Sequence, residues 1–217
     1  MPEEFVLDIV ERATTVRDSL ENYDCLPIEY DLNPIPPYCG DGAIKLIIVG
    51  QDPTVKNKKS REQISVALNL DKKCTIATYI EEGICKPLGI SLDEVYATNL
   101  FKYFYQIPPS RSIDVLNAHL KPNLELLLEE IRQLPVCPVI TLGEPVLQLL
   151  SCDSKVKLRN YWNYNGKGFS YLQKEENKLG RIIFPFVHLN SRYKSFYKAK
   201  FSEFSAFVHG VIDTMQD

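Results

Sequence analysis

AIKLIIVGQDPT, residues 43–54, is a run of aliphatic residues that ends in a glycine and continues into an amide, a carboxylate, a proline and a threonine. A short and continuously apolar run of this kind is typical of a strand that is buried on both faces. The glycine and the proline constrain the turn that follows. The sequence therefore predicts a buried strand that delivers Asp52 to a fixed turn at its carboxyl end.

Three further apolar runs have the same character. None of them alternates apolar and polar residues as a half-solvated antiparallel strand does, so we expect a parallel sheet that is covered on both faces. Helical patterns lie between and around the runs, which predicts a three-layer α/β domain with a mostly parallel sheet. The three runs are VYATNLF at 95–101, PVITLG at 138–143 and RIIFPFVHL at 181–189.

Helical periodicity predicts five helices. Thr75 is expected to cap the second, and Pro122 to kink or split the third, which is the longest. Because there is no repeat and no long linker, we expect one domain over residues 1–217, on which the N-terminal helix packs. Four helices are expected at 3–22, 75–87, 112–134 and 144–151. The fifth is a C-terminal helix with apolar residues at helical spacing, namely Phe201, Phe204, Val208, Val211, Ile212 and Met215. The stretches 23–42 and 153–180 are expected to be irregular.

Composition limits the class of protein. Hydrophobic residues make up 45% of the 217 residues and charged residues 24%, which fits a folded domain. No apolar run reaches the roughly 18 residues of a membrane helix. The N-terminus is acidic and amphipathic, unlike a secretory signal, so we expect a cytoplasmic protein. The six cysteines form no C-x-x-C pair, which argues against iron–sulfur and zinc sites and favours reduced, mostly buried thiols.

Polar residues stand where the predicted strands end. Asp52 follows the first strand, Asn99 lies near the end of the second, and His188 lies near the end of the fourth. The carboxyl ends of parallel strands share one edge of a sheet, where ligands bind. A carboxylate, an amide and an imidazole together suit cleavage of an N-glycosidic bond, in which the sugar becomes cationic and the departing base anionic. Taken singly, the three also fit a turn cap, a buried amide and an ordinary strand-end histidine.

Two basic stretches stand out against the net charge of −3, which gives no general attraction to nucleic acid. Residues 56–61 read KNKKSR, and residues 192–200 read RYKSFYKAK. Basic residues interleaved with aromatic ones suit contact with phosphates and bases. Taken alone, either stretch is more simply explained as a solvated surface.

Three motifs resemble those of the uracil-DNA glycosylase superfamily, and the resemblance covers most of residues 40–210. The turn Gly50-Gln51-Asp52-Pro53 is similar to the G-Q-D-P-Y-H motif of one branch. Thr98-Asn99-Leu100-Phe101-Lys102, followed by Pro108-Pro109-Ser110-Arg111, resembles the T-N-x-x-K and P-P segment of other branches. Val187-His188-Leu189-Asn190-Ser191 stands where the superfamily carries its H-P-S motif.

The resemblance implies an α/β/α sandwich with a central four-stranded parallel sheet. It implies a monomeric DNA glycosylase of base excision repair that hydrolyses uracil or a related damaged base from DNA, with no metal or organic cofactor. The base would leave the stack to enter the pocket. Asp52 would orient water or stabilise the sugar cation, and His188 would donate to the base oxygen. The residues implied to bind the base are Gln51, Asn99 and Thr54, and those implied to contact DNA are Ser191, Arg192, Lys194 and Lys198.

The sequence departs from the superfamily pattern at four places. Thr54 replaces a tyrosine that excludes the methyl group of thymine, and Val55 replaces a histidine. The stretch 60–70 lacks the aromatic residue that stacks on the base, so Tyr79 or Phe101 would have to substitute. The last motif reads H-L-N-S-R, which puts Arg192 where the superfamily has a leucine that wedges into the stack.

Two other functions remain open at this point. A glycosylase-like module that binds nucleic acid or protein without catalysis would bind damaged DNA and release no base. A nucleoside or nucleotide hydrolase would turn over free nucleosides or nucleotides and would not respond to removal of the charges of Lys194 and Lys198. The sequence contains no P-loop and no G-x-G-x-x-G motif to support a phosphate-cradling enzyme.

Overall fold

The computed structural model describes residues 3–109 and 112–216 and contains a five-stranded sheet in the order β1-β3-β2-β4-β5. Four strands run parallel, and β1 (Tyr38–Cys39) pairs antiparallel with β3 at one edge. The parallel strands are β2 (Leu46–Gly50), β3 (Val95–Asn99), β4 (Val139–Leu142) and β5 (Ile183–Phe186).

The four parallel strands confirm the four predicted from apolar runs. Every residue in them is buried, which explains why the runs do not alternate. The strand β1 was not predicted, because two residues inside a proline-containing stretch carry no readable periodicity. The register places Gly50 at the end of β2 beside Asn99 at the end of β3, so polar residues after these strands meet at one edge.

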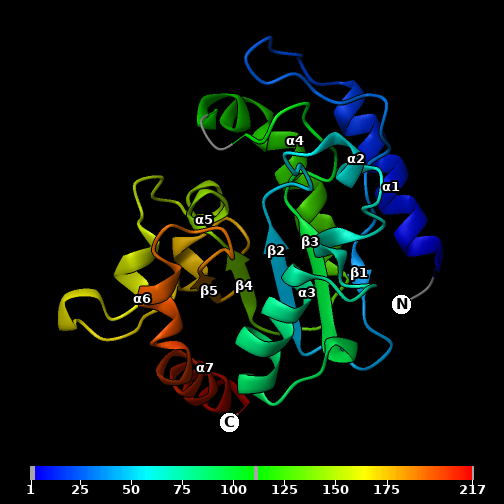
Figure 1. Cartoon of the computed structure of the whole chain (residues 1–217). Coiled ribbons are helices and arrows are strands. Elements are labelled where there is room, and N and C mark those ends of the chain that lie inside the picture. The colour runs from blue at the N-terminus through cyan, green and yellow to red at the C-terminus, as the bar shows by residue number, and fades with distance from the viewer. Residues whose placement is uncertain (1–2, 110–111, 217) are drawn as a thin grey trace.

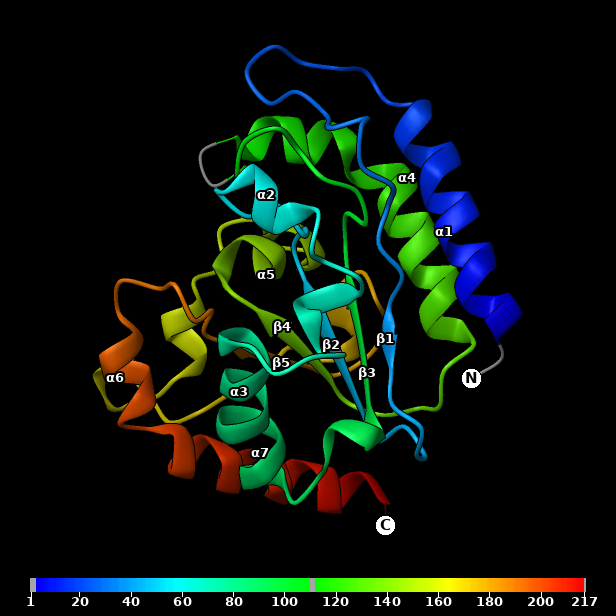
Figure 2. The ribbon, with the colours of Figure 1, turned by 45° about the vertical axis from the view of Figure 1, so that its right-hand side comes forward.

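Helices cover both faces of the sheet, which confirms the three-layer α/β/α sandwich (Figure 1). The helices α1 (Glu3–Asp18) and α4 (Ile113–Arg132) lie side by side on one face, and Arg12 of α1 pairs with Glu129 of α4. On the opposite face lie α3 (Thr75–Ile80) and α7 (Phe201–Gln216) (Figure 2). The short helices α2 (Lys58–Arg61), α5 (Glu144–Leu150) and α6 (Lys194–Lys198) complete the set, and α2 and α6 were not predicted.

The predicted helix at 75–87 is three elements. After α3 the chain forms a π-helical turn over Glu81–Cys85 and a 3-10 turn over Lys86–Leu88. The prediction that Thr75 caps the helix was wrong: Cys74 holds the extended N-cap conformation, and no side chain caps this end. A β-carbon on Gly83 would lie 2.9 Å from Cε2 of Phe201, so the π-helical turn brings backbone close to α7.

The helix α4 runs unbroken through Pro122. Proline removes one backbone donor from the helix interior. The side chain of Asn123, the next residue, donates to the carbonyl of His119 at 2.8 Å.

The irregular stretch 153–180 is fastened to the core by Trp162. Its indole is fully buried, stacks on Phe204 at 4.1 Å between ring centroids, and donates to the carbonyl of Pro185 at 2.7 Å.

All six cysteines are free thiols, as predicted, but the prediction that most are buried was wrong. Only Cys85 and Cys137 are buried, whereas Cys25 and Cys152 are exposed on loops.

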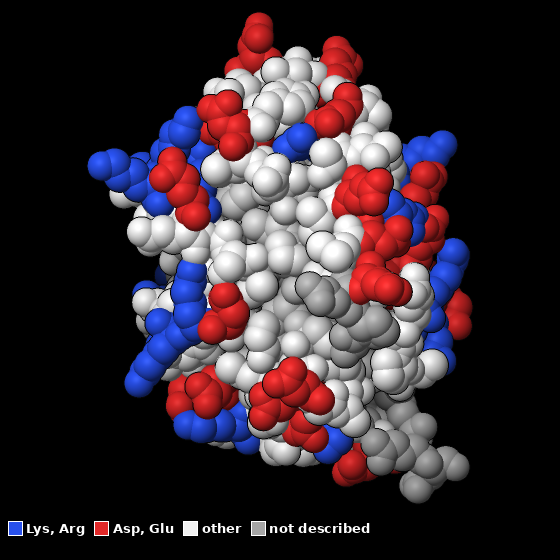
Figure 3. All heavy atoms as spheres, turned by 90° about the vertical axis from the view of Figure 1, so that its right-hand side faces the viewer, with Lys and Arg blue, Asp and Glu red and all other residues white. Residues whose placement is uncertain are grey.

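The face that carries the β1 edge has acidic and basic side chains interspersed around a largely uncharged centre (Figure 3). Such a mixture is typical of a solvated surface. Within residues 3–109 and 112–216, no helix combines the length and the apolar character needed to cross a bilayer.

A buried ion pair holds the end of β3. Lys102 is 1% exposed and its ammonium group lies 2.5 Å from Oε2 of Glu130 on α4. The same ammonium group donates to Oγ1 of Thr98 at 2.7 Å and to the carbonyl of Asn99 at 3.0 Å. The hydroxyl of Tyr96 donates to the other carboxylate oxygen of Glu130 at 2.6 Å. Every charge in this cluster is therefore compensated within the core.

We predict that Lys102→Met destabilises the protein by about 3–5 kcal/mol, because it leaves the carboxylate of Glu130 buried and unpaired. The measurement is the free energy of unfolding in urea. Adding Glu130→Gln to that variant should recover most of the loss. The control is Lys86→Met, which removes an exposed pair with Glu82 and should cost under about 1 kcal/mol. Equal losses in the two single variants would contradict the assignment.

Candidate active site

A cavity of about 690 Å³ opens at the carboxyl edge of the sheet. It is bounded by the ends of β2, β4 and β5, by the loop that follows β5, and by Pro108 and Pro109. Ser110 and Arg111, which belong to the same resemblance, lie outside the described residues. Six of the nine predicted site residues line this cavity, namely Gln51, Asp52, Thr54, His188, Ser191 and Arg192. Asn99, Lys194 and Lys198 do not line it.

The turn after β2 is fixed by backbone hydrogen bonds. The amide of Leu100 donates to the carbonyl of Gly50, and the amide of Phe101 donates to the carbonyl of Gln51, both at 2.9 Å. Within the turn, the amide of Thr54 donates to Oδ1 of Asp52 at 2.8 Å. This Asx-type turn fixes the carboxylate relative to the end of the sheet.

The pKa of Asp52 is raised to about 6, and burial of its carboxyl group is the largest cause. Hydrogen bonds from the side chain and the amide of Thr54, and the positive charge of Arg61, act in the opposite direction. Asp52 is therefore mostly ionised at neutral pH in a poorly solvated place. Such a carboxylate interacts strongly with a positive charge that develops nearby.

Thr54 is held by Tyr105. The amide of Tyr105 donates to Oγ1 of Thr54 at 2.8 Å, so the hydroxyl hydrogen remains free to bond the carboxylate of Asp52. This threonine lines the cavity and also orients the acid. The sequence predicted the first role and gave no sign of the second.

His188 projects from the loop after β5 and is partly buried. The amide of Asn190 donates to its Nδ1 at 3.2 Å, so the neutral ring carries its proton on Nε2. Burial lowers the pKa of His188 below its usual value, which keeps the ring neutral at pH 7. The imidazole can thus donate one hydrogen bond from Nε2 without carrying a charge.

Gly143, at the end of β4, allows the histidine to sit there. Its φ is +98°, and a β-carbon on it would lie 3.2 Å from Cβ of His188. Only glycine adopts this backbone conformation readily. The following residue, Glu144, accepts a hydrogen bond from the amide of Leu158 at 3.0 Å and pairs with Lys157 at 3.4 Å, so its charge is compensated.

The amide of Asn99 lies behind the cavity wall. Asn99 is 2% exposed, and neither polar atom of its side chain has a hydrogen-bond partner among the described residues. A β-carbon on Gly50 would lie 2.3 Å from Oδ1 of Asn99 and 3.0 Å from Cδ2 of Leu68. Gly50 and Leu68 line the cavity, whereas Asn99, which pairs with Gly50 in the sheet, does not.

Leu68 is the cavity residue from the stretch 60–70, where the sequence lacks an aromatic residue. Leu68 and Asn69 both have left-handed backbones, with φ of +58° and +52°. Consecutive left-handed residues other than glycine are strained, and such strain is found mostly where a site requires it. The two aromatic substitutes named from the sequence, Tyr79 and Phe101, are buried and do not line this cavity.

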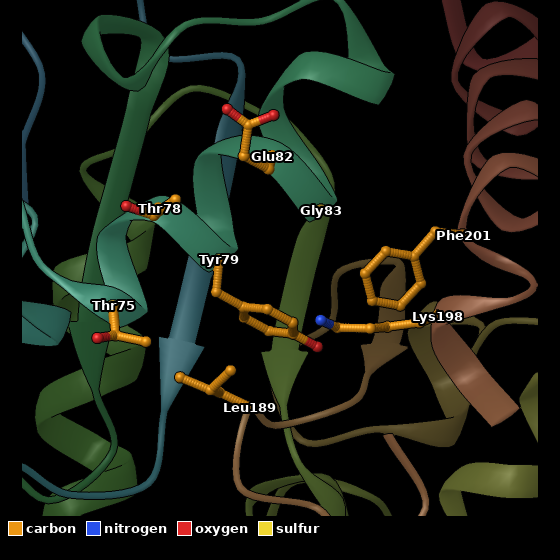
Figure 4. A pocket seen from close by; sticks show the side chains of 8 residues that line it. All are labelled: Thr75, Thr78, Tyr79, Glu82, Gly83, Leu189, Lys198 and Phe201. Carbon is orange, nitrogen blue, oxygen red and sulfur yellow. The ribbon is translucent and has the colours of Figure 1, made fainter. Parts of the chain in front are cut away.

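Lys198 lines a different cavity. This second cavity, of about 680 Å³, lies between α3 and the start of α7, and Lys198 and Tyr79 point toward one another inside it (Figure 4). The hydroxyl of Tyr79 donates to the carbonyl of Val187 at 2.8 Å. Leu189 also lines the second cavity, so the loop around His188 separates the two cavities.

The rim of the first cavity carries exposed cationic and aromatic side chains. Arg192 and Tyr193 line it, and the ring of Tyr193 is 73% exposed. Lys194 follows on the exposed start of α6. The amide of Tyr193 donates to Oγ of Ser191 at 3.3 Å. Tyr193 is one of the aromatic residues that the sequence interleaves with the cations of 192–200.

The other basic stretch, 56–61, does not form one surface. Lys58 is exposed and lies 3.6 Å from both Glu29 and Asp31. Arg61, three residues later on α2, is only 3% exposed. Among the residues that the structure describes, no group of three or more histidine, cysteine, aspartate or glutamate side chains is arranged as a metal site.

A family model described as the uracil DNA glycosylase superfamily matches residues 36–209, which includes every element from β1 to most of α7. No curated protein matches the chain.

Proposed function

The chain belongs to the uracil-DNA glycosylase superfamily, and from this premise we propose that it hydrolyses the N-glycosidic bond of uracil or a related damaged base in DNA. The observation that carries the proposal is the pairing of Asp52 and His188 around one cavity. The first is a partly buried carboxylate that is mostly ionised at neutral pH, and the second is a neutral imidazole with its proton on Nε2. They suit the two opposite charges that appear when the bond breaks.

In the proposed reaction, the bond between the sugar C1′ and the base nitrogen breaks, and its electron pair leaves with the base. Asp52 stabilises the positive charge that develops on the sugar and orients the water that attacks C1′. Nε2–H of His188 donates to the base oxygen that gains negative charge. The proton that the water loses is left with the carboxylate of Asp52 or with solvent, and the departing base takes up a proton.

Gln51, Thr54 and Asn99 are the proposed contacts to the base. Gln51 and Thr54 line the cavity, which supports direct contact. The unsatisfied amide of Asn99 has both a donor and an acceptor to offer, and it lies beside Gly50 of the cavity wall. Leu68 provides an aliphatic surface for the base in place of an aromatic ring.

DNA is proposed to lie across the rim of the first cavity. Ser191, Arg192 and Lys194 would contact phosphates, and the exposed ring of Tyr193 is placed to fill the gap that an extruded base leaves. Lys198 would contact DNA only if the strand continues past the loop to the second cavity. We also propose that the protein acts as a monomer in cytoplasmic base excision repair.

The salt dependence of DNA binding tests this rim. Binding should be measured on a uracil-containing duplex in an Asp52→Asn background, so that no base is released. Arg192→Gln and Lys194→Gln should each weaken binding and lower the slope of log K against log salt by about 0.7–0.9. The control is Lys174→Gln, which removes an exposed charge from a remote turn and should leave the slope unchanged. Unchanged slopes in all three variants would place the DNA elsewhere.

The experiment that tests the proposed function is base release from labelled oligonucleotides that contain uracil, hypoxanthine, xanthine or a G·T mismatch. Each is offered as a single strand and as a duplex. Release of one of these bases supports the proposal and identifies the base that Thr54 and Leu68 accept. Turnover of free nucleosides, with none of oligonucleotides, would favour a nucleoside hydrolase instead.

The concealed amide of Asn99 favours a second candidate function. If Asn99 stays buried as it is, the pocket lacks its most specific contact to the base. The chain would then be a glycosylase-like module that binds DNA without catalysis. Measurable binding to damaged duplexes together with no base release from the whole panel would select this alternative.

A further inference from the structure

Arg61 is a buried cation that the proposed chemistry does not yet use. It belongs to the basic stretch 56–61, yet only 3% of its surface is exposed. Burying a guanidinium group costs free energy unless its donors are satisfied. Its Nε donates to the carbonyl of Val55 at 2.7 Å, and its Nη1 donates to the carbonyl of Tyr105 at 3.1 Å. The nearest carboxylate, that of Glu29, is 3.9 Å away.

These contacts hold the turn that carries Asp52. Val55 ends the segment that begins at Asp52, so the guanidinium group fixes the far side of the turn. Both backbone polar groups of Tyr105 form hydrogen bonds here. Its carbonyl accepts from Arg61, and its amide donates to Oγ1 of Thr54. Arg61, Thr54 and Tyr105 therefore connect α2, the turn after β2 and the segment after β3 in one hydrogen-bonded unit.

Arg61 is also the charge that favours the ionised form of Asp52. Its positive charge acts to lower the pKa of the acid, against the raising effect of burial. The tyrosines near the acid are neutral at pH 7, because burial raises the pKa of Tyr103 and of Tyr105 above the usual value.

The other titratable groups that line the cavity do not replace it. His188 is kept neutral by burial, and burial raises the pKa of Tyr197 to about 12. Glu144 is paired with Lys157. Arg192 and Tyr193 are exposed on the rim, where water screens charge. Lys102, the other buried cation near these strand ends, is paired with Glu130, so Arg61 is the buried cation whose charge acts on Asp52.

We propose that Arg61 is a positioning residue for base release, which holds the turn of Asp52 in place and keeps its carboxylate ionised within the cavity. The inference rests on the proposed function for its catalytic meaning. Its effect on Asp52 can be measured without catalysis.

Three variants separate charge from geometry. Arg61→Gln removes the charge, Arg61→Lys keeps it and loses the planar pair of donors, and Lys58→Gln is the matched control. Lys58 belongs to the same short helix and also lies near Glu29, but it is exposed and does not touch the turn. The titration of Asp52 is followed by NMR of ¹³C-labelled aspartate carboxyl groups, with Asp52→Asn to assign the signal.

In the unaltered protein we expect Asp52 to titrate near pH 6. In Arg61→Gln the titration should rise by less than about one pH unit, because the charge of Arg61 acts less strongly on Asp52 than the two hydrogen bonds from Thr54, and the acid limb of the rate profile should move with it. Arg61→Lys should restore the titration while base release at pH 8 stays at least about tenfold slower, because the turn is less firmly held. Lys58→Gln should titrate as the unaltered protein does.

An Asp52 titration that is the same in folded Arg61→Gln and in the unaltered protein would overturn the proposal. If Arg61→Gln fails to fold, Arg61→Lys decides: wild-type titration with slowed release supports the proposal, and wild-type rate overturns it. If no oligonucleotide loses a base, the proposed function fails, and the NMR titration of Arg61→Gln and Arg61→Lys still shows whether Arg61 keeps Asp52 ionised.

Discussion

Replacing Asp52 by asparagine should slow base release at pH 7.5 by about 10³-fold, within the range for loss of a catalytic acid or base. The amide keeps an oxygen to accept the hydrogen bond of the Thr54 amide, so the turn should survive. What is lost is the negative charge beside the sugar. The measurement is the single-turnover rate on the preferred oligonucleotide. The control is Asp153→Asn, because Asp153 makes the same kind of turn, with the amide of Lys155 at 2.8 Å, at an exposed site.

The same substitution should stabilise the fold. The pKa of Asp52 is higher in the folded protein than in an unfolded chain, so the contribution of this residue to stability is full at low pH. That contribution is lost as pH rises from about 4 to about 6, because ionisation is then disfavoured in the folded state. Asp52→Asn removes the loss and should add about 1–3 kcal/mol to the free energy of unfolding at pH 8. The gain should disappear near pH 4.

Below pH 6, the rate of the unaltered enzyme should fall tenfold for each pH unit, because only the ionised form of Asp52 is active. Asp52→Asn should lack this acid limb. Base release that persists at near wild-type rate in Asp52→Asn would remove Asp52 from the mechanism.

Replacing His188 by alanine should slow base release by about 10²–10³-fold, the usual effect of removing one donor from a developing anion. The loss should be nearly constant from pH 7.5 to pH 9, because burial lowers the pKa of His188 and the ring is neutral in that range. The acid limb set by Asp52 should stay near pH 6 in this variant. The pH profile of the single-turnover rate tests both statements.

The control for His188 is His209→Ala, which removes an exposed histidine on α7 that contacts the carbonyl of Pro87. It should leave the rate unchanged. If His188→Ala instead shifted the acid limb, then His188 would be titrating in the reaction, and its assignment as a neutral donor would be wrong.

The parts of the fold that were predicted correctly are those with a long-range pattern. The four parallel strands are continuous apolar runs, and α1, α4 and α7 have wide apolar stripes, so burial leaves a clear trace in the sequence. The strand β1 and the helices α2 and α6 have two to five residues each, which is too short for periodicity. The π-helical turn after α3 depends on the close approach of Gly83 to Phe201, which only the folded chain reveals.

The residues of the candidate site also fall into those that the sequence could predict and those that it could not. Asp52 and His188 could be brought together from sequence because parallel strands end at one edge. The burial of Asn99 could not, since it depends on how closely the ends of β2 and β3 pack. Arg61 looked like part of a basic surface because charge in a sequence does not show which side of a short helix faces inward. Lys198 was grouped with Arg192, although the loop around His188 places them at different cavities.

The most direct test of the central claim is mass spectrometry of a uracil-containing oligonucleotide after a single turnover. We expect the free base, uracil or the preferred damaged base, and an abasic strand with an unbroken backbone, in equal amounts. With Asp52→Asn we expect neither product. The claim is contradicted if the oligonucleotide stays intact with every base of the panel, or if Asp52→Asn gives the same products.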